Sequence, residues 1–315
     1  MASNVNLHNA KKQQNDEFYT RMVDIEHELQ WYTEHFKGAT ILCNTDSPKS
    51  NFWKFFHQRF HEYGLKRLIA THIETDRNSY AMIYDGDSDD ADTDSGIIIP
   101  LKGNGDFRST ECVEYLKQAD IIITNPPFSL FRDFVTLVDK YNKDFIVIGN
   151  MNAITYKEVF PLFVQNRLWL GCTNFSKDMY FYVPEGYEYK DTYKYERELE
   201  DKAVCRIAVC CWFTTLKYSY QKRQLSLTEK YSPEKYHQYD NYPAINVDKV
   251  SEIPIDYDGV MGVPITYIDK HNPDEFEIIG HEHDIYGNGG EGLPEGQFIV
   301  NGKGVYKRIL IKRRK

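Results

Sequence analysis

Short apolar runs alternate with amphipathic segments through the first two thirds of the chain. Five of these runs are rich in β-branched residues and lack polar alternation, which is typical of buried strands: 39–44, 66–73, 96–100, 120–125 and 144–150. Between them, 51–64 and 130–141 have helical apolar spacing, and 108–119 opens on hydroxyl residues that can cap a helix. This alternation predicts an α/β fold built on a parallel sheet.

The pattern changes after about residue 218. Tyrosines, prolines and short strand-like runs replace the earlier alternation, as in "YSPEKYHQYDNYPAINV" and "EFEIIG". A change of this kind, without a repeat or a low-complexity linker, indicates a domain boundary. We therefore expect one domain at 1–218 and a smaller second region at 219–315.

Composition narrows the class of protein. The 315 residues are 41% hydrophobic, which is enough for a sizeable core. The N-terminus is polar where a secretory signal needs an apolar block, and no apolar run is long enough to span a membrane. Six cysteines occur without C-x-x-C spacing, and Cys210 and Cys211 lie in an apolar run, which indicates reduced thiols in a core strand. The sequence thus predicts a cytoplasmic protein without a membrane partner.

Charge is unevenly distributed along the chain. The formal net charge of -9 argues against a surface that is basic throughout. However, six aspartates lie within 85–94, and seven lysines and arginines lie in the final thirteen residues. A solvated loop and a solvated tail would have the same composition. Net charge therefore does not decide whether the partner is a polyanion.

Candidate chemistry lies where the run at 120–125 ends, in Asn125-Pro126-Pro127-Phe128. Ligands of parallel sheets bind beyond the carboxyl ends of the strands. Because proline has no N–H and a fixed φ, this turn presents the Asn125 side-chain oxygen and the Pro126 carbonyl as rigid acceptors. Such a pair can hold the amino group of an aromatic base, and Phe128 can stack on that base. The alternative is a turn that merely ends the strand.

Together with other blocks, this turn resembles the EcoRI-type N6-adenine DNA methyltransferases. The similar blocks follow one another along nearly the whole chain: "DEFYT" (16–20), 35–56, "GDFRS" (105–109), "DIIITNPPFSLFRDF" (120–134), "NAITYKEVF" (152–160) and 239–268. The resemblance implies a Rossmann-like, S-adenosylmethionine-dependent methyltransferase sheet at 1–218 with a target-recognition region at 219–315. It implies methyl transfer from S-adenosylmethionine to N6 of an adenine flipped out of double-stranded DNA.

The resemblance also implies roles for individual residues. The catalytic turn is Asn125 to Phe128, in which Asn125 and Pro126 match the pair that holds the target amine and Phe128 matches the stacking ring. The residues that match cofactor-binding positions are Phe18, Tyr19, Thr20, Asp46, Glu74, Asp106, Phe107 and Asn125. Asp106 is expected to accept from the cofactor's adenine amine, and Phe107 to pack against that ring.

Two of these assignments keep a structural alternative. The chain has "CNTDSPKSN" where many methyltransferases have a glycine-rich turn, and the EcoRI-type relatives lack these glycines too. Asp46, expected near the methionine amine, is equally suited to a helix N-cap or a turn. Glu74, expected at the ribose hydroxyls, is equally suited to be a surface acid at the end of a strand.

Access to the target and recognition of DNA need further residues. A base in a duplex must be rotated out of the stack, so aromatic side chains should line its pocket. Tyr180 or Phe181 is expected to flank the base opposite Phe128, and the alternative is a pair of core aromatics. The residues expected to contact DNA are Lys222, Arg223, Arg313 and Arg314.

Partners and competing functions follow from these assignments. The expected partners are double-stranded DNA and, in a restriction-modification system, an endonuclease that acts on the same site. A stand-alone or phage enzyme fits the sequence as well. In each case the protein is expected to act as a monomer. No metal is expected, because displacement at a sulfonium needs no Lewis acid. Two alternatives remain: methylation of RNA adenine or protein glutamine, and a non-catalytic DNA-binding relative. The EcoRI-type blocks count against the first alternative, and the intact "FYT", "GDF" and Asn-Pro-Pro-Phe against the second.

Overall fold

Two compact units make up the structure, a computed structural model. The first unit comprises residues 1–159 and 170–218, and the second comprises 160–169 and 219–315. The residues that the structure describes are 18–44, 50–73, 79–88, 92–173, 179–183, 194–195, 204–207, 210–218, 225–282 and 297–314.

An eight-stranded sheet is the centre of the first unit, with the strand order β5-β4-β3-β2-β6-β7-β12-β8. Its strands are β2 (Thr40–Asn44), β3 (Arg67–His72), β4 (Tyr80–Tyr84), β5 (Ile97–Pro100), β6 (Ile121–Thr124), β7 (Asp144–Asn150), β8 (Trp169–Leu170) and β12 (Cys210–Thr214). Strands β3, β2, β6 and β7 are parallel, whereas β4, β5 and β12 pair antiparallel to their neighbours. The sheet is therefore mixed with a parallel centre, not parallel throughout.

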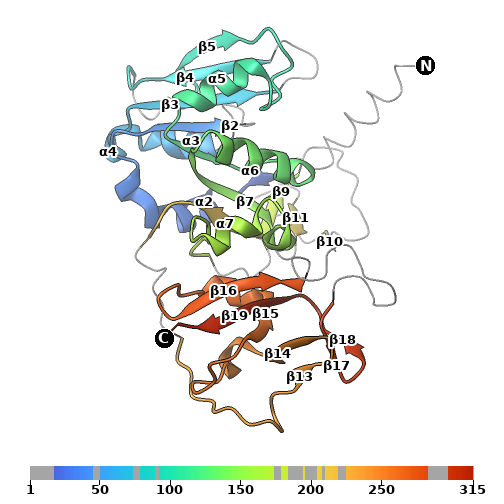
Figure 1. The fold of residues 1–315 in the computed structure, drawn as a ribbon. Coiled ribbons are helices and arrows are strands. Elements are labelled where there is room, and N and C mark those ends of the chain that lie inside the picture. Colours follow the sequence, from blue (N-terminus) through green and yellow to red (C-terminus); the bar gives the residue numbers. More distant parts are fainter. Residues whose placement is uncertain are drawn as a thin grey trace, which may run out of the picture. The chain divides into compact units, whose positions relative to one another are not determined.

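The chain reverses its direction across this sheet between β2 and β6. After β2 it proceeds to β3, β4 and β5 on one side, and then returns to form β6 and β7 on the other side. Figure 1 shows β5, β4, β3 and β2 following one another from the top of the view. Such a reversal opens a crevice at the carboxyl ends of the two strands, where ligands bind in open α/β sheets. The residues that end β2 and follow β6 are therefore placed for chemistry.

Local sequence explains where the helices begin. They are α2 (Met22–Leu29), η1 (Gln30–His35), α3 (Asn51–Gln58), α4 (Phe60–Tyr63), α5 (Thr110–Gln118), η2 (Phe128–Leu130), α6 (Phe131–Lys140) and η3 (Met151–Thr155). The Ser50 side chain accepts from Trp53 N and caps α3, and the Ser109 side chain accepts from Cys112 N and caps α5. The apolar faces of α3 and α6 bury aromatic side chains, including Trp53 and Phe134. The helical segments predicted from the sequence are thus confirmed.

Strand β5 differs from its prediction. The five predicted strands all form, but Ile97, Ile98 and Ile99 in β5 are 63%, 58% and 37% exposed, so the expectation of a buried strand was wrong. The reason is position, because β5 lies at the edge of the sheet. A short apolar run specifies a strand but not its place in a sheet. Strand β4 was not anticipated, since its residues "YAMIY" lack a clear period.

A smaller antiparallel sheet completes the first unit, in the order β1-β9-β11-β10. Its strands are β1 (Tyr19–Thr20), β9 (Met179–Tyr182), β10 (Lys194–Tyr195) and β11 (Val204–Ile207). The register pairs Thr20 with Phe181, so the segment before α2 lies beside β9. The six cysteines, which all lie in described ranges, form no disulfide, and Cys210 and Cys211 are buried in β12, as the sequence predicted.

The second unit is built on a five-stranded sheet of order β13-β14-β15-β19-β16. Its elements are α7 (Phe160–Val164), β13 (Gln238–Tyr239), β14 (Tyr242–Asn246), η5 (Val250–Glu252), β15 (Met261–Pro264), η6 (Ile265–Lys270), β16 (Phe276–His281), β17 (Ile299–Val300), β18 (Lys303–Gly304) and β19 (Arg308–Arg313). Strand β19 lies between β15 and β16, and Ile309, Leu310 and Ile311 are fully buried. Among the described residues of both units, no helix has the length and apolarity needed to cross a membrane.

Candidate active site

The Asn-Pro-Pro-Phe turn directly follows β6 at the carboxyl edge of the central sheet. Pro126 is buried, and Asn125, Pro127 and Phe128 are partly buried. The turn closes through a hydrogen bond of 2.9 Å from Leu130 N to the Pro127 carbonyl oxygen, and α6 begins at the next residue. Two prolines in succession remove two N–H donors and fix two φ angles, so the segment is stiff. The sequence thus places a rigid turn at the crevice between β2 and β6.

Only one of the two polar atoms of the Asn125 amide has a hydrogen-bond partner among the described residues. Its Nδ2 donates to the Phe18 carbonyl oxygen at 2.7 Å. Because a carbonyl can only accept, this contact fixes which end of the amide carries the oxygen. Within the described part of the chain, the buried Oδ1 atom has no hydrogen-bond partner. The side chain therefore holds a fixed acceptor that can bind a donor from a ligand.

Three phenylalanine rings pack together at this turn, and one of them belongs to Phe18, whose carbonyl oxygen binds Asn125. The Phe18 ring centroid is 5.7 Å from those of Phe128 and Phe181, and the Phe128 and Phe181 centroids are 6.4 Å apart and nearly perpendicular. Tyr180, the neighbour of Phe181 on β9, has its ring 5.5 Å from the Arg21 guanidinium. Successive strand residues point to opposite faces. Of the two residues that the sequence offered for this position, Phe181 is the one beside Phe128.

The segment Phe18 to Thr20 passes between this cluster and α3. Phe18 and Thr20 are buried, whereas Tyr19 is 46% exposed. The Thr20 carbonyl oxygen accepts from Asn51 Nδ2 at 2.8 Å, and Asn51 is the first residue of α3. Thr20 Oγ1 is buried without a partner among the described residues. The segment therefore adds a second open polar atom to the site.

A buried polar layer joins the carboxyl ends of three adjacent strands. Asn44, Thr71 and Thr124 end or nearly end β2, β3 and β6, and all three are 0% exposed. Thr71 Oγ1 donates to Asn44 Oδ1 at 2.6 Å, and Thr124 Oγ1 donates to the Asn44 carbonyl oxygen. Asn44 Nδ2 has no partner in the described ranges. Asn44 was not predicted from the sequence, although a polar residue that ends an apolar strand is a usable signal.

The loop that contains Asp106 and Phe107 precedes α5. A left-handed glycine shapes it: Gly105 has φ +77°, and a Cβ there would lie 2.9 Å from the His72 carbonyl oxygen. The Asp106 carboxylate accepts from Arg108, which lowers the pKa of Asp106, chiefly through the side-chain hydrogen bond. Phe107 is buried, with its ring centroid 5.5 Å from that of Phe134 in α6. Asp106 thus stays ionised, while Phe107 anchors the loop to α6.

The remaining predicted site residues either lie outside the described residues or belong to the second unit. Asp46, Glu74, Lys222 and Arg223 lie outside the described residues. In the second unit, Arg313 belongs to β19, where its Nη2 donates to the Pro254 carbonyl oxygen at 3.3 Å and its guanidinium lies 4.7 Å from the Phe276 ring centroid. Arg314 is exposed, and its backbone N donates to the Glu275 carbonyl oxygen. Most of the basic C-terminal run is therefore part of a sheet.

Comparison with known proteins gives a consistent result. Residues 6–314 match the family described as adenine-specific methyltransferase EcoRI. The chain is 42% identical to the Type II methyltransferase M.EcoRI of Escherichia coli, with 100% of this chain and 98% of the relative covered. It is 38% identical to the Type II methyltransferase M.MpnI of Mycoplasma pneumoniae, with 97% of each covered. No solved structure matches the chain.

Proposed function

The chain belongs to the family of adenine-specific EcoRI-type methyltransferases, and from this premise we propose that it methylates adenine N6 in double-stranded DNA as a Type II modification enzyme. The observation that carries the proposal is the open Asn125 Oδ1 acceptor. Asn125 follows β6, at the point where the chain reverses across the sheet, and it binds the carbonyl oxygen of Phe18, whose ring packs on those of Phe128 and Phe181. An acceptor next to aromatic rings suits the amino group of a base.

The open polar atoms of the site also fit S-adenosylmethionine. Buried polar atoms without partners are costly, so a ligand that satisfies them gains that free energy. In the described part of the site, Asn44 Nδ2 and Thr20 Oγ1 can donate, and the ionised Asp106 carboxylate can accept. The cofactor carries a carboxylate, hydroxyls and an adenine amine that complement this set. We infer that Thr20, Asn44 and Asp106 hold the cofactor.

The chemistry assigned to Asn125 and Pro126 follows from the nature of the target. The amine of adenine is a weak nucleophile because its lone pair is delocalised into the ring. Hydrogen bonds from its two N–H groups to Asn125 Oδ1 and the Pro126 carbonyl oxygen favour rehybridisation as the new bond forms. S-adenosylmethionine, when bound, supplies a methyl group on a positively charged sulfur that leaves as a neutral thioether. The protein thus needs fixed acceptors and no nucleophilic side chain.

The phenylalanine cluster offers a surface for the flipped base. Rotation of a base out of the duplex costs a few kcal/mol. Stacking on an aromatic ring returns about 1–3 kcal/mol per base. Phe128 is partly exposed, whereas Phe18 and Phe181 are buried. We therefore assign the stacking contact to Phe128, and the buried rings of Phe18 and Phe181 support it.

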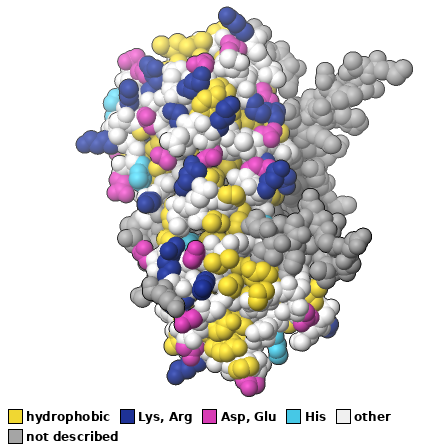
Figure 2. Space-filling view, in the orientation of Figure 1, with side chains coloured by type: hydrophobic (Ala, Val, Ile, Leu, Met, Phe, Trp, Pro, Cys, Tyr) yellow, Lys and Arg dark blue, Asp and Glu magenta, His cyan; other side chains and the backbone are white. Residues whose placement is uncertain are grey.

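Recognition of DNA is assigned to the second unit. Its described part presents exposed basic side chains on β18 and β19, namely those of Lys303 and Lys312, and at Arg314. On the face drawn in Figure 2, lysines and arginines are interspersed with acids and do not form one patch. Local contacts to phosphates, not overall charge, would then draw in the duplex. We also propose that the protein is a cytoplasmic monomer and that its partner is an endonuclease that acts on the same DNA site.

Transfer of a labelled methyl group tests the proposed function. Wild-type protein is incubated with methyl-labelled S-adenosylmethionine and, separately, duplex DNA, RNA or protein. We expect label in duplex DNA only, and none in a matched duplex whose adenines already carry an N6-methyl group. Label in RNA or protein alone would move the activity to another substrate class, and no transfer to any acceptor would leave a non-catalytic DNA-binding protein.

A further inference from the structure

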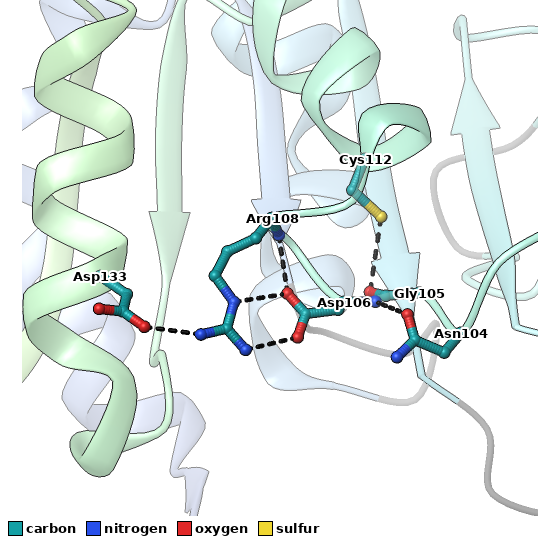
Figure 3. Close-up of polar contacts among 6 residues, drawn as sticks. All are labelled: Asn104, Gly105, Asp106, Arg108, Cys112 and Asp133. Atoms are coloured by element: carbon teal, nitrogen blue, oxygen red, sulfur yellow. Dashed lines mark hydrogen bonds and ion pairs between the residues drawn. The ribbon is translucent and has the colours of Figure 1, made fainter.

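Arg108 connects the loop before α5 to helix α6, as Figure 3 shows. Its Nε donates to Asp106 Oδ1 at 3.0 Å and its Nη2 donates to Asp106 Oδ2 at 2.7 Å, which is a bidentate fork. The remaining terminal nitrogen, Nη1, donates to Asp133 Oδ2 at 2.6 Å. Arg108 precedes α5, whereas Asp133 lies in the first turn of α6. One guanidinium thus binds carboxylates from two segments.

The fork leaves one position open on the Asp106 carboxylate. Each carboxylate oxygen can accept about two hydrogen bonds. Oδ1 accepts from both Nε and the backbone N of Arg108, the latter at 2.8 Å. Oδ2 accepts from Nη2 alone among the described contacts. The carboxylate is therefore held in one orientation, with a single free acceptor position on Oδ2.

Asp106 is accessible to a ligand, since its side chain is 21% exposed. The backbone around it is fixed as well: Asp106 N donates to Asn104 Oδ1 at 3.1 Å, and Cys112 Sγ donates to the Gly105 carbonyl oxygen. A carboxylate that is both oriented and reachable can select a donor at a defined place. An amine satisfies that acceptor, whereas a carbonyl oxygen in the same place is repelled.

The other end of Arg108 lies close to the catalytic turn in sequence. Asp133 is two residues beyond the start of α6, and α6 directly follows η2, which contains Phe128. Phe107 packs on Phe134 in the same helix, so a polar and an apolar contact join the same two segments. The Asp106 loop is thereby fixed relative to the turn that carries Asn125.

Stabilisation of the fold is a weak explanation for this pair of contacts. The side chains of Arg108 and Asp133 are 43% and 52% exposed. Ion pairs at that exposure contribute little to stability, because water and salt screen them. Bidentate geometry mainly adds directional specificity. The arrangement is thus better suited to orienting a carboxylate than to holding the unit together.

We propose that Arg108 is a positioning residue that aims Asp106 Oδ2 at the 6-amino group of the cofactor's adenine and fixes this loop to α6 through Asp133. The proposal rests on the proposed function, in which Asp106 binds that amine. It extends that function by naming the residue that makes the site select adenine over a 6-oxo purine.

Binding of two cofactor products tests the proposal. Dissociation constants are measured by calorimetry for S-adenosylhomocysteine and for S-inosylhomocysteine, which carries an oxygen in place of the amine. We expect wild-type protein to prefer the adenine compound by about tenfold or more, the usual effect of a hydrogen bond to a charged group. Arg108→Ala should reduce that preference to about twofold, and so should Arg108→Lys, which keeps the charge but cannot form the fork.

Arg67 supplies the matched control. It forms a comparable fork with Asp85, at 2.7 and 2.9 Å, at the amino end of β3. Arg67→Ala should keep the full preference for the adenine compound. A preference that survives Arg108→Ala, or that Arg67→Ala removes equally, would overturn the role of Arg108. If wild-type protein methylates DNA but has no such preference, the positioning role fails while the proposed function stands.

Discussion

The two edges of the central sheet differ in how their polar groups are satisfied. At the amino ends of the parallel strands, Asp120 Oδ2 accepts from Thr40 N at 2.8 Å, and Asp120 N donates to the Thr40 carbonyl oxygen at 2.9 Å. The Arg67 guanidinium and the Asp85 carboxylate satisfy each other at the same edge. These contacts are reciprocal, so the four described residues satisfy one another without a ligand.

At the carboxyl edge, by contrast, some buried polar atoms have no hydrogen-bond partner among the described residues. Among the residues that the structure describes there, Thr20, Asn44 and Asn125 each have a buried polar atom without a partner. Native folds satisfy most such atoms, so three at one edge are unusual. The two edges of the sheet therefore have different roles. The amino edge stabilises the fold, and the carboxyl edge has open polar atoms that can bind a ligand. Substitutions at the two edges should therefore have different consequences.

The largest effect is expected from Asn125→Ala. Loss of a fixed acceptor for the reacting amine should lower the rate of methyl transfer by at least about 10²–10³-fold, the usual cost of a removed electrostatic contact in a transition state. Binding of S-adenosylhomocysteine should survive, because the fold and the rest of the cofactor site remain. Single-turnover transfer and calorimetry on the same preparation check both statements. Gln118→Ala, which removes an exposed amide from α5, is the control and should transfer at the wild-type rate.

Phe128→Ala should have the next largest effect. Removal of the ring should weaken productive holding of the flipped base by about 1–3 kcal/mol. Phe128→Tyr keeps the ring and should retain activity. Fluorescence of a 2-aminopurine placed at the target position reports the flipped state directly. Equal flipping by Phe128→Ala and wild type would remove Phe128 from the pocket.

At the amino edge, Asp120→Ala should alter stability and not transfer. The backbone N–H of buried Thr40 loses its partner, which should cost about 1 kcal/mol. Urea unfolding should show that loss, while the rate of transfer per folded molecule stays at the wild-type value. A drop in transfer rate without a drop in stability would mean that the two edges are not separate in function.

The smallest effect is expected from the second unit. Arg314→Gln with Lys315→Gln should weaken binding to every duplex alike, and reduce the slope of log K against log salt by about one to two, because phosphate contacts read no sequence. Arg313→Gln is a separate variant, since its side chain packs on Phe276 and should affect stability as well. Titrations of cognate and scrambled duplexes at several salt concentrations distinguish the outcomes. A loss confined to the cognate duplex would show that this segment reads bases.

Sequence alone predicted the parts of this comparison that depend on local pattern. The β-branched runs specified β2, β3, β6 and β7, and two prolines after β6 indicated a stiff turn. The hydrophobic pattern did not predict the exposure of β5, because exposure depends on the neighbouring strands in the sheet. It left Tyr180 and Phe181 equivalent, and the distance of 6.4 Å between ring centroids shows that Phe181 is the one beside Phe128.

The polar network of the carboxyl edge was not predictable from spacing. Asn44 contacts Thr71 and Thr124, which are 27 and 80 residues away in the chain. Arg108 reaches Asp133 across 25 residues. Such contacts exist only once the strands are ordered in the sheet, and no local period specifies that order. The one signal in the sequence was a polar residue at the end of a predicted buried strand, and Asn44 is such a residue.

Product analysis tests the central claim most directly. Duplex DNA containing the methylated site is digested to nucleosides after single-turnover reaction with wild type, Asn125→Ala and Asp120→Ala, and the products are identified by mass spectrometry. The account predicts N6-methyldeoxyadenosine from wild type and Asp120→Ala at similar rates, and almost none from Asn125→Ala. The same product at the wild-type rate from Asn125→Ala, or a methyl group on any other atom of the DNA, would contradict it.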